Sequence, residues 1–395
     1  MFFRNKNNNI KISNDDKIWV ELEMLKLFMV FNTDFKDITQ YLFTKEYFKE
    51  TYKNKEITPD NLIIDLCNLF SIDYAKINYE VIFDIRDLEQ VHYFIKGDIF
   101  EARAISIDDG YKIYIANDTL KNAGRLIYNL VYEFSKIKLI DTGYIKTIKT
   151  KTRYDIFIAV VYFGFGLFLS NKLIDVGTKN SGFWTVRWRY YTNFPEPVLA
   201  YLLAIMEIIG DNKNIEDKLP ESLKEEYDKC LIYLNKNGAE LIDLQQVKNF
   251  NSIGKNPELL IRKDKLSGIR KTISTFINNV AYHFIKLNEL DKSLELLKKA
   301  FQIDPDSKYI NNNLAYIYIR KNKLDLGKKY LDRVISEGNI LKAYYNRNKA
   351  LYYVKLNRLD MAKEYFDKAF SYKDIKVDML DEHYAEYLAK KGLKE

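Results

Sequence analysis

The sequence Lys-Leu-Asn-Glu-Leu-Asp at residues 286–291 decides the fold of the second half of the chain, because it returns twice in altered form. Arg-Lys-Asn-Lys-Leu-Asp stands at residues 320–325 and Lys-Leu-Asn-Arg-Leu-Asp at residues 355–360, at offsets of 34 and 35 residues. Repeats of this length are typical of stacked helical hairpins, each of which cannot bury its hydrophobic face alone. Residues 272–376 are therefore predicted to form three pairs of helices.

Other positions recur in the same register, and each has a structural explanation. An alanine follows an asparagine by two residues in every unit, and small residues return late in the second helix, where helices cross closely. An asparagine between the paired helices tolerates a left-handed backbone. We expect the aspartate three residues later to cap the second helix. These positions are Asn279, Ala281, Asn313, Ala315, Asn348 and Ala350; Ala300, Val334 and Ala369; Asn288, Asn322 and Asn357; and Asp291, Asp325 and Asp360.

This pattern is similar to that of tetratricopeptide repeats. The resemblance implies an all-α array in which the first helix of each pair lines a concave groove. In this register the groove presents amides, tyrosines and cations, which suit an extended peptide with acidic side chains or a free carboxylate. The plainer interpretation is a packing or dimerisation surface. The predicted groove residues are Asn279, Tyr282, Lys286, Asn313, Tyr316, Arg320, Asn348 and Lys355.

The front half of the chain is organised around residues 126–139, Leu-Ile-Tyr-Asn-Leu-Val-Tyr-Glu-Phe-Ser-Lys-Ile-Lys-Leu. Its apolar residues are spaced by three and four, which predicts a helix with one buried face. Tyr132, Glu133 and Lys136 stand beside that face. Because Glu and Lys three residues apart commonly form a weak surface pair, the plainer interpretation is an ordinary helix with one solvated side.

The segments around this helix combine strands and helices. Alternating apolar residues predict strands at residues 79–83 and 111–116. Thr58 and Pro59 are typical of a helix start, so residues 61–70 are predicted to be helical. Residues 156–171 are predicted to form one buried helix, in which glycines allow close backbone packing. The front half is therefore of mixed α and β class.

The order of these segments resembles a bacterial family of zincin-like proteins that pair a small H-E-x-x-H domain with helical repeats. The resemblance is carried by residues 43–48, 111–116, 126–139, 155–171 and 197–204. It implies an α+β domain in which Tyr132 and Lys136 stand at the positions of the two histidine ligands. It also places Glu133 at the general base and Asp155 at the acidic ligand.

A catalytic zinc site needs about three protein ligands, and only Asp155 remains of them here. Lys136 would bring an ammonium group close to any bound cation and would oppose metal binding. The resemblance therefore implies a degenerate site without catalytic residues, metal or cofactor, in which Lys136 neutralises Glu133 or Asp155. The alternative is an active zinc-dependent peptidase with atypical ligands.

Composition adds further expectations. The 395 residues are 47% hydrophobic and carry a formal net charge of +7, which permits acidic partners without demanding nucleic acid. The two cysteines, Cys67 and Cys230, lie far apart, which is typical of a reducing compartment. No apolar region follows the basic N-terminal residues, and the apolar run at residues 156–169 is too short to span a membrane. We therefore expect a cytoplasmic protein.

The segment at residues 184–191 suggests nucleic-acid binding as a second alternative. Residues 184–191, Trp-Thr-Val-Arg-Trp-Arg-Tyr-Tyr, offer arginines and stacking aromatics, and residues 146–153 are rich in lysine. An amphipathic edge strand with its aromatics in the core and a solvated loop explain them more simply. The lone histidines His92, His283 and His383 are expected to be structural or exposed.

These observations predict a protein in two parts. They favour a non-catalytic protein–protein interaction adaptor or regulator whose repeats bind a protein or peptide. The predicted organisation is a flexible N-terminus at residues 1–14, a degenerate zincin-like α+β domain at 15–248, a linker at 249–271, three repeats at 272–376, and a capping helix at 377–395.

Overall fold

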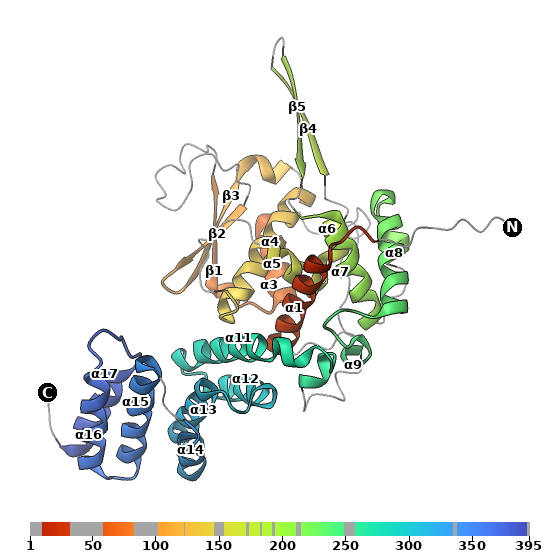
Figure 1. Cartoon of the computed structure of the whole chain (residues 1–395). Helices are drawn as coiled ribbons and strands as arrows, with labels where there is room; N and C mark the ends of the chain where they lie inside the picture. The colour runs from red at the N-terminus through yellow and green to blue at the C-terminus, as the bar shows by residue number, and fades with distance from the viewer. Residues whose placement is uncertain are drawn as a thin grey trace. The chain divides into compact units, whose positions relative to one another are not determined.

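The computed structural model of the chain divides into two compact units (Figure 1). The front unit comprises Met1–Gly254 and Leu259–Lys263, and the repeat unit comprises Lys255–Glu258 and Asp264–Glu395. Each unit is described by itself. The structure describes residues 10–31, 58–82, 102–121, 123–145, 154–170, 174–181, 184–191, 194–210, 215–248, 257–334 and 338–392.

Helices build most of the front unit around a buried apolar core. Helix α4 packs against α3, α5 and strand β2, and α7 packs against α1 and α8. Ten of the fourteen residues of α7 are buried, which explains why it is apolar on nearly every side. The helices are α1 (Asn14–Phe31), α3 (Pro59–Phe70), α4 (Ala123–Asp141), α5 (Tyr154–Val160), α6 (Gly166–Ser170), α7 (Glu196–Ile209), α8 (Glu221–Asn237) and α9 (Leu244–Lys248).

The predicted start of α3 is confirmed. The hydroxyl of Thr58 accepts a hydrogen bond from the backbone N–H of Asn61 at 3.3 Å, and Pro59 occupies the first helical position. The helix ends at Ser71, whose φ of 51° is left-handed. Thr58 therefore satisfies one of the N–H groups that a helix start leaves without an internal partner.

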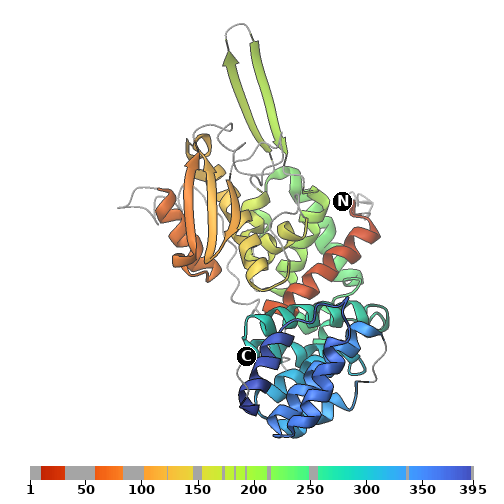
Figure 2. The same ribbon diagram turned by 90° about the vertical axis from the view of Figure 1, so that its left-hand side faces the viewer.

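A small three-stranded sheet has the order β1-β3-β2 (Figure 2). Strand β3 (Gly110–Ala116) pairs in parallel with β1 (Ile77–Ile82) and antiparallel with β2 (Ala102–Ile107). The predicted strand at residues 111–116 is confirmed, as is the described part of the strand predicted at 79–83. At the turn before β3, a Cβ on Gly110 would lie 2.2 Å from the carbonyl oxygen of Lys76, so this position requires glycine.

The prediction of one continuous helix at residues 156–171 is wrong. A π-helical turn at Val161–Phe165 separates α5 from α6, and Gly164 within it has a φ of 92°. That left-handed conformation is open to glycine at little steric cost, which explains the break. Close packing is found at Gly166, where a Cβ would lie 2.8 Å from the Cδ2 of Leu203.

Strands β4 (Ile174–Ser181) and β5 (Trp184–Tyr191) form an antiparallel hairpin that extends away from the helices of the front unit (Figure 1). The register pairs Ile174 with Tyr191 and Ser181 with Trp184. The strand of the edge-strand interpretation is therefore confirmed at residues 184–191, and the core position expected for its aromatics stays a prediction.

The repeat unit contains three helical pairs and a final helix. Within each pair the two helices pack together, and successive first helices also pack on one another. The first repeat helix begins at Leu266, six residues before the predicted start of the repeats, and the final helix begins at Leu380 rather than at Val377. The pairs are α11 (Leu266–Lys286) with α12 (Leu290–Ile303), α13 (Lys308–Arg320) with α14 (Leu324–Leu331), and α15 (Asn339–Lys355) with α16 (Leu359–Phe370), followed by α17 (Leu380–Lys391).

The turns inside the pairs confirm one expectation and correct another. Asn288, Asn322 and Asn357 have left-handed φ angles of 57°, 58° and 59°. The following aspartates were expected to be caps, and this is wrong, because the N-cap residues are instead Glu289, Lys323 and Arg358, without side-chain cap bonds. The aspartates lie inside the first turn of the helix, where their charge still favours the helix N-terminus. They are Asp291, Asp325 and Asp360.

The small residues predicted at the helix crossings are all buried. Ala281, Ala315, Ala350 and Ala300 are fully inaccessible to solvent, and Ala369 is 1% exposed. Their size allows the paired backbones to approach closely, as the repeat pattern requires.

Candidate functional site

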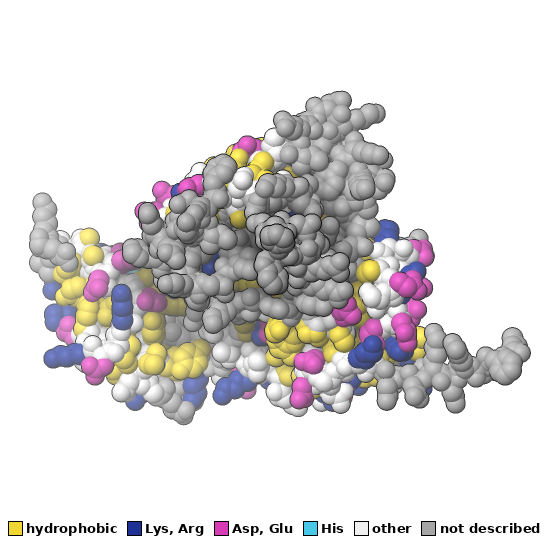
Figure 3. All heavy atoms as spheres, turned by 90° about the horizontal axis from the view of Figure 1, so that it is seen from above, with side chains coloured by type: hydrophobic (Ala, Val, Ile, Leu, Met, Phe, Trp, Pro, Cys, Tyr) yellow, Lys and Arg dark blue, Asp and Glu magenta, His cyan; other side chains and the backbone are white. Residues whose placement is uncertain are grey.

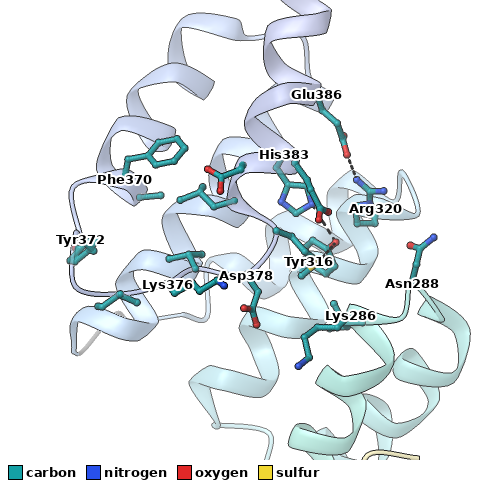
Figure 4. Close-up of a pocket in the computed structure, with 18 of the residues that line it drawn as sticks. Lys286, Asn288, Tyr316, Arg320, Phe370, Tyr372, Lys376, Asp378, His383 and Glu386 are labelled. Carbon is teal, nitrogen blue, oxygen red and sulfur yellow. Dashed lines mark hydrogen bonds and ion pairs between the residues drawn. The ribbon is translucent and has the colours of Figure 1, made fainter. Parts of the chain in front are cut away.

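A groove of about 810 Å³ opens in the repeat unit (Figure 4). Its walls come from α11, α13 and residues 369–386, which include the last residues of α16, the connection after it and most of α17. Predicted groove residues Lys286, Tyr316 and Arg320 line it. All of its lining therefore belongs to one unit.

The C-terminal segment, defined here as residues 371–391, closes this groove, and its path was not predicted. Tyr282 of α11 donates a hydrogen bond from its hydroxyl to Oδ2 of Asp378 at 2.9 Å. Arg320 of α13 forms an ion pair with Glu386 of α17, and the hydroxyl of Tyr316 lies 3.4 Å from Nε2 of His383. Figure 4 shows Tyr316 and His383 pointing toward one another. Side chains of the first helices are thus bound to the chain's own C-terminal segment.

Arg347 is the central side chain of this contact, and sequence reasoning missed it. It is fully buried, although it is charged. Its Nη1 donates to the backbone oxygen of Asp378 at 2.6 Å, and its Nε and Nη2 donate to Oδ1 of Asn348 at 3.1 and 2.8 Å. The guanidinium also lies 4.9 Å from the ring centre of Tyr316 and 5.1 Å from that of Tyr344. Oxygen atoms and aromatic faces therefore stabilise this cation.

None of the asparagines predicted for the groove lines it, and two of them link neighbouring first helices. Nδ2 of Asn313 donates to Oδ1 of Asn278 at 2.9 Å, and Nδ2 of Asn348 donates to Oδ1 of Asn312 at 3.0 Å. Asn279 is exposed and lies outside the groove lining. The helix face that carries amides is thus turned toward the adjacent first helix. The signal for Arg347 was present in the register, since it stands where the first two units have Asn278 and Asn312.

Burial is the largest cause of the pKa shifts of His383 and Tyr282. Burial, together with the positive charges of Arg347, Arg320 and Lys355, lowers the pKa of His383 from 6.5 to about 3. His383 is therefore neutral at physiological pH and serves as a structural partner of Tyr316. Lys355, a predicted groove residue, contributes through this electrostatic effect. Burial also raises the pKa of Tyr282, and so does its bond to Asp378.

The positions of the expected degenerate site lie in the front unit. The interpretation of a solvated helix side is wrong, because Glu133 and Lys136 are each only 4% exposed and form an ion pair. Oε2 of Glu133 also accepts a hydrogen bond from the backbone N–H of Ala104 in β2, at 2.8 Å. The ring of Tyr132 packs against Phe157, with 4.9 Å between ring centres. Asp155 stands in the first turn of α5.

Within the described part of the chain, no group of three His, Cys, Asp or Glu side chains is placed to hold a metal ion. His92, the lysine-rich residues 146–153 and residues 43–48, which carried part of the zincin resemblance, lie outside the described residues. On the face of the molecule shown in Figure 3, basic side chains of the described residues are interspersed with acidic ones.

Comparison with known proteins identifies part of the repeat unit. Residues 309–337 and 342–374 match the family model of the tetratricopeptide repeat. The match covers the second and third helical pairs, and the first pair, α11 and α12, has the same form in the structure. The resemblance predicted for the repeats is therefore confirmed over these residues.

No curated protein matches the chain. No solved structure matches it either. A zincin-like domain in the front unit thus receives no support from these comparisons. Among the helices described, none is long and apolar enough to cross a membrane.

Proposed function

We propose that this chain is a non-catalytic adaptor or regulator that binds a protein or peptide through the groove of its repeat unit. Tetratricopeptide repeats generally mediate protein–protein interactions, and two of them are present here. The observation that carries the proposal is the groove of about 810 Å³, to which the first helices contribute Lys286, Tyr316 and Arg320 and residues 369–386 contribute the remaining wall. A groove of this kind can hold several residues of an extended peptide, and it contacts a peptide on more sides than a flat surface does.

The charges of the groove favour an acidic partner. Lys286 lines it and is exposed, and no described carboxylate lies within ion-pair distance of its ammonium group. Arg320 is paired with Glu386, so it already holds an acidic side chain in this position. Both cations suit a partner that carries acidic side chains or a free carboxylate.

The binding proposal is tested by reversing charge at Lys286 in the full chain. Proteins that co-purify with the wild-type chain are quantified by mass spectrometry and compared with those of the Lys286→Glu variant. Lys329→Glu is the matched control, because Lys329 is an exposed lysine on the second helix α14. We expect Lys286→Glu to lose groove partners at least about tenfold, since a favourable ion pair becomes a repulsion. Equal recovery by all three chains would reject the groove as the binding site.

The front unit, in this proposal, is a zincin-like domain without peptidase activity. Lys136 supports this view, because its ammonium group lies against Glu133, where a metal-bound water would need that carboxylate. The competing function is a zinc peptidase with atypical ligands, and zinc content separates the two. Elemental analysis of the full chain, purified without chelator or histidine tag, is expected to find no stoichiometric zinc. About one zinc per chain would restore the peptidase, with loss of hydrolysis in Glu133→Ala as its next test.

A further inference from the structure

The first helices of all three pairs bind the same C-terminal segment, residues 371–391. Tyr282 of α11 binds the side chain of Asp378, and Arg347 of α15 binds its backbone oxygen. Tyr316 of α13 contacts His383 and also Met379, whose sulfur is 3.6 Å from the hydroxyl. In a stacked array each repeat contacts only its neighbours, so a helix that merely closed the array would not involve α11. The segment therefore runs across the array and not only onto its end.

The segment is held as a bound peptide would be. Between α16 and α17 its backbone is not helical, and its main-chain groups meet side chains of the array. The backbone N–H of Asp378 donates to the hydroxyl of Tyr344 at 3.4 Å, and the same hydroxyl lies 3.5 Å from the backbone oxygen of Lys376. Val377 and Leu380 are 8% and 6% exposed and join one apolar cluster with side chains of α15 and α16. Two aliphatic anchors thus flank an acidic residue.

Two features bear on the exchange of this segment: one favours its release, and the other leaves a binding group for the partner. Met379 has a φ of 59°, a left-handed conformation that is sterically unfavourable for a non-glycine residue and is relieved when the segment leaves. Departure of the segment would also uncover the guanidinium of Arg347, because the oxygen bonded to its Nη1 belongs to Asp378. An uncovered guanidinium binds a carboxylate or a carbonyl strongly.

We propose that residues 371–391 are a resident ligand of the groove, and that the partner is an extended acidic segment with flanking aliphatic residues that exchanges with them. This inference rests on the proposed function and specifies the chemistry of the partner. The partner places an acidic residue beside Tyr282 and Arg347, where Asp378 lies now, and aliphatic residues in the places of Val377 and Leu380. Because the resident segment is tethered, it competes at a high effective concentration and lowers the apparent affinity for the partner.

The test uses the full chain and a fluorescent synthetic peptide of residues 371–391. Asp378→Arg in the full chain places a second cation beside Arg347 and weakens the resident segment, while the side chains of α11, α13 and α15 stay as they are. Fluorescence anisotropy is expected to show the peptide binding at least about tenfold more tightly to this variant than to the wild-type chain. The matched control is Asp374→Arg, since Asp374 is an exposed aspartate of the same segment, and it should bind like wild type. A peptide that itself carries Asp378→Arg should not bind.

A folded Asp378→Arg chain with wild-type affinity for the peptide would overturn the proposal, and so would unchanged hydrogen exchange at residues 371–379. Circular dichroism checks the fold. If that variant does not fold, Val377→Ala in the full chain shortens one aliphatic anchor of the resident segment but not of the peptide, and a gain of about two- to fivefold is expected. No gain would count against the proposal.

The outcome is separable from that of the proposed function. Peptide exchange needs only parts of this chain, whereas partner capture needs Lys286. Loss of captured proteins in Lys286→Glu without any peptide exchange would leave the binding function standing and reject the resident ligand.

Discussion

Each unit of this protein buries a charge completely, and the two charges have opposite signs. In the front unit Glu21 of α1 is inaccessible to solvent, and its carboxylate accepts hydrogen bonds from three consecutive backbone N–H groups at 2.9, 2.5 and 3.2 Å. The hydroxyl of Tyr201 donates to it as well, at 2.5 Å. In the repeat unit Arg347 is buried to the same extent and donates to oxygen atoms. The three N–H groups that donate to Glu21 belong to Glu240, Leu241 and Ile242.

The difference lies in what each charge holds together. Glu21 joins α1 to a segment more than 200 residues later in the same unit, through hydrogen bonds from backbone N–H groups of that segment. Arg347 joins its own neighbour, Asn348, to the C-terminal segment that we propose can leave. A buried charge therefore fixes permanent structure in one unit and marks an exchangeable contact in the other. Four predictions test this contrast.

The largest effect is expected for Glu21→Ala, which leaves three backbone N–H groups and a tyrosine hydroxyl without an acceptor in the core. The free energy of unfolding of the front unit should fall by roughly 3–5 kcal/mol. Urea denaturation measures the loss, and hydrogen exchange should locate it at residues 239–242. Glu225→Ala, at an exposed carboxylate paired with Lys229, is the control and should change stability by less than about 0.5 kcal/mol. If Glu21→Ala lowered the free energy of unfolding by less than about 1 kcal/mol, Glu21 would not be the group that holds α1 to residues 240–242.

Arg347→Met should lower the free energy of unfolding of the repeat unit by roughly 2–4 kcal/mol, because the oxygens of Asn348 and Asp378 lose charged donors. It should also speed hydrogen exchange in residues 371–379. Arg358→Met, at an exposed arginine of the same unit, provides the comparison. If exchange in the C-terminal segment stayed at the wild-type rate, Arg347 would not be the group that holds it.

Acid should weaken the repeat unit through His383, whose pKa is lowered to about 3 in the folded chain. Below the ordinary pKa of 6.5, the unfolded chain binds a proton that the folded chain does not. Stability is therefore fully present above about pH 6.5 and falls by up to ~1.4 kcal/mol for each pH unit between there and about pH 3. His383→Gln should remove this contribution. Melting temperatures from pH 7.5 to 4.5 test it, and equal slopes in both chains would disprove it.

The smallest effect concerns the turn at Asn357, with a φ of 59°. Asn357→Ala should cost about 1 kcal/mol, because alanine tolerates the left-handed conformation poorly, whereas Asn357→Gly should be nearly neutral. Chemical denaturation of the two variants measures the difference. Similar losses for alanine and glycine would mean that the asparagine side chain, and not its backbone, stabilises the turn.

For the repeat unit, the sequence predicts the helices and their buried residues better than the residues that line the groove. Three aligned copies specify which residues are small, buried or left-handed, and Ala281, Ala315 and Ala350 lie where their register requires. A step of one residue turns a helical side chain by about 100°, so the choice between Asn278 and Asn279 was beyond the repeat pattern. The C-terminal segment has no second copy with which to align. Its path across Tyr282 and Arg347 could therefore not be read from the sequence.

In the front unit, local sequence signals predict helices and strands but not which of their polar side chains are buried. Thr58 and Pro59 mark a helix start, and the alternation after Gly110 marks a strand, because both depend on neighbouring residues. Glu133 and Lys136 stand three residues apart whether a helix faces water or a sheet. Only the position of β2, with the N–H of Ala104 directed at Glu133, decides that the pair is buried.

The hydrogen bonds between Glu21 and residues 240–242 affect the order in which the chain folds during its synthesis. A ribosome delivers α1 early, but the N–H groups of residues 240–242 that satisfy its carboxylate emerge only after most of the front unit has been synthesised. Until then Glu21 must keep its hydration, so α1 cannot settle into its final place. Each helical pair of the repeat unit, in contrast, closes over neighbouring residues as they appear. Helix α1 is thus among the last parts of the front unit to reach its final place.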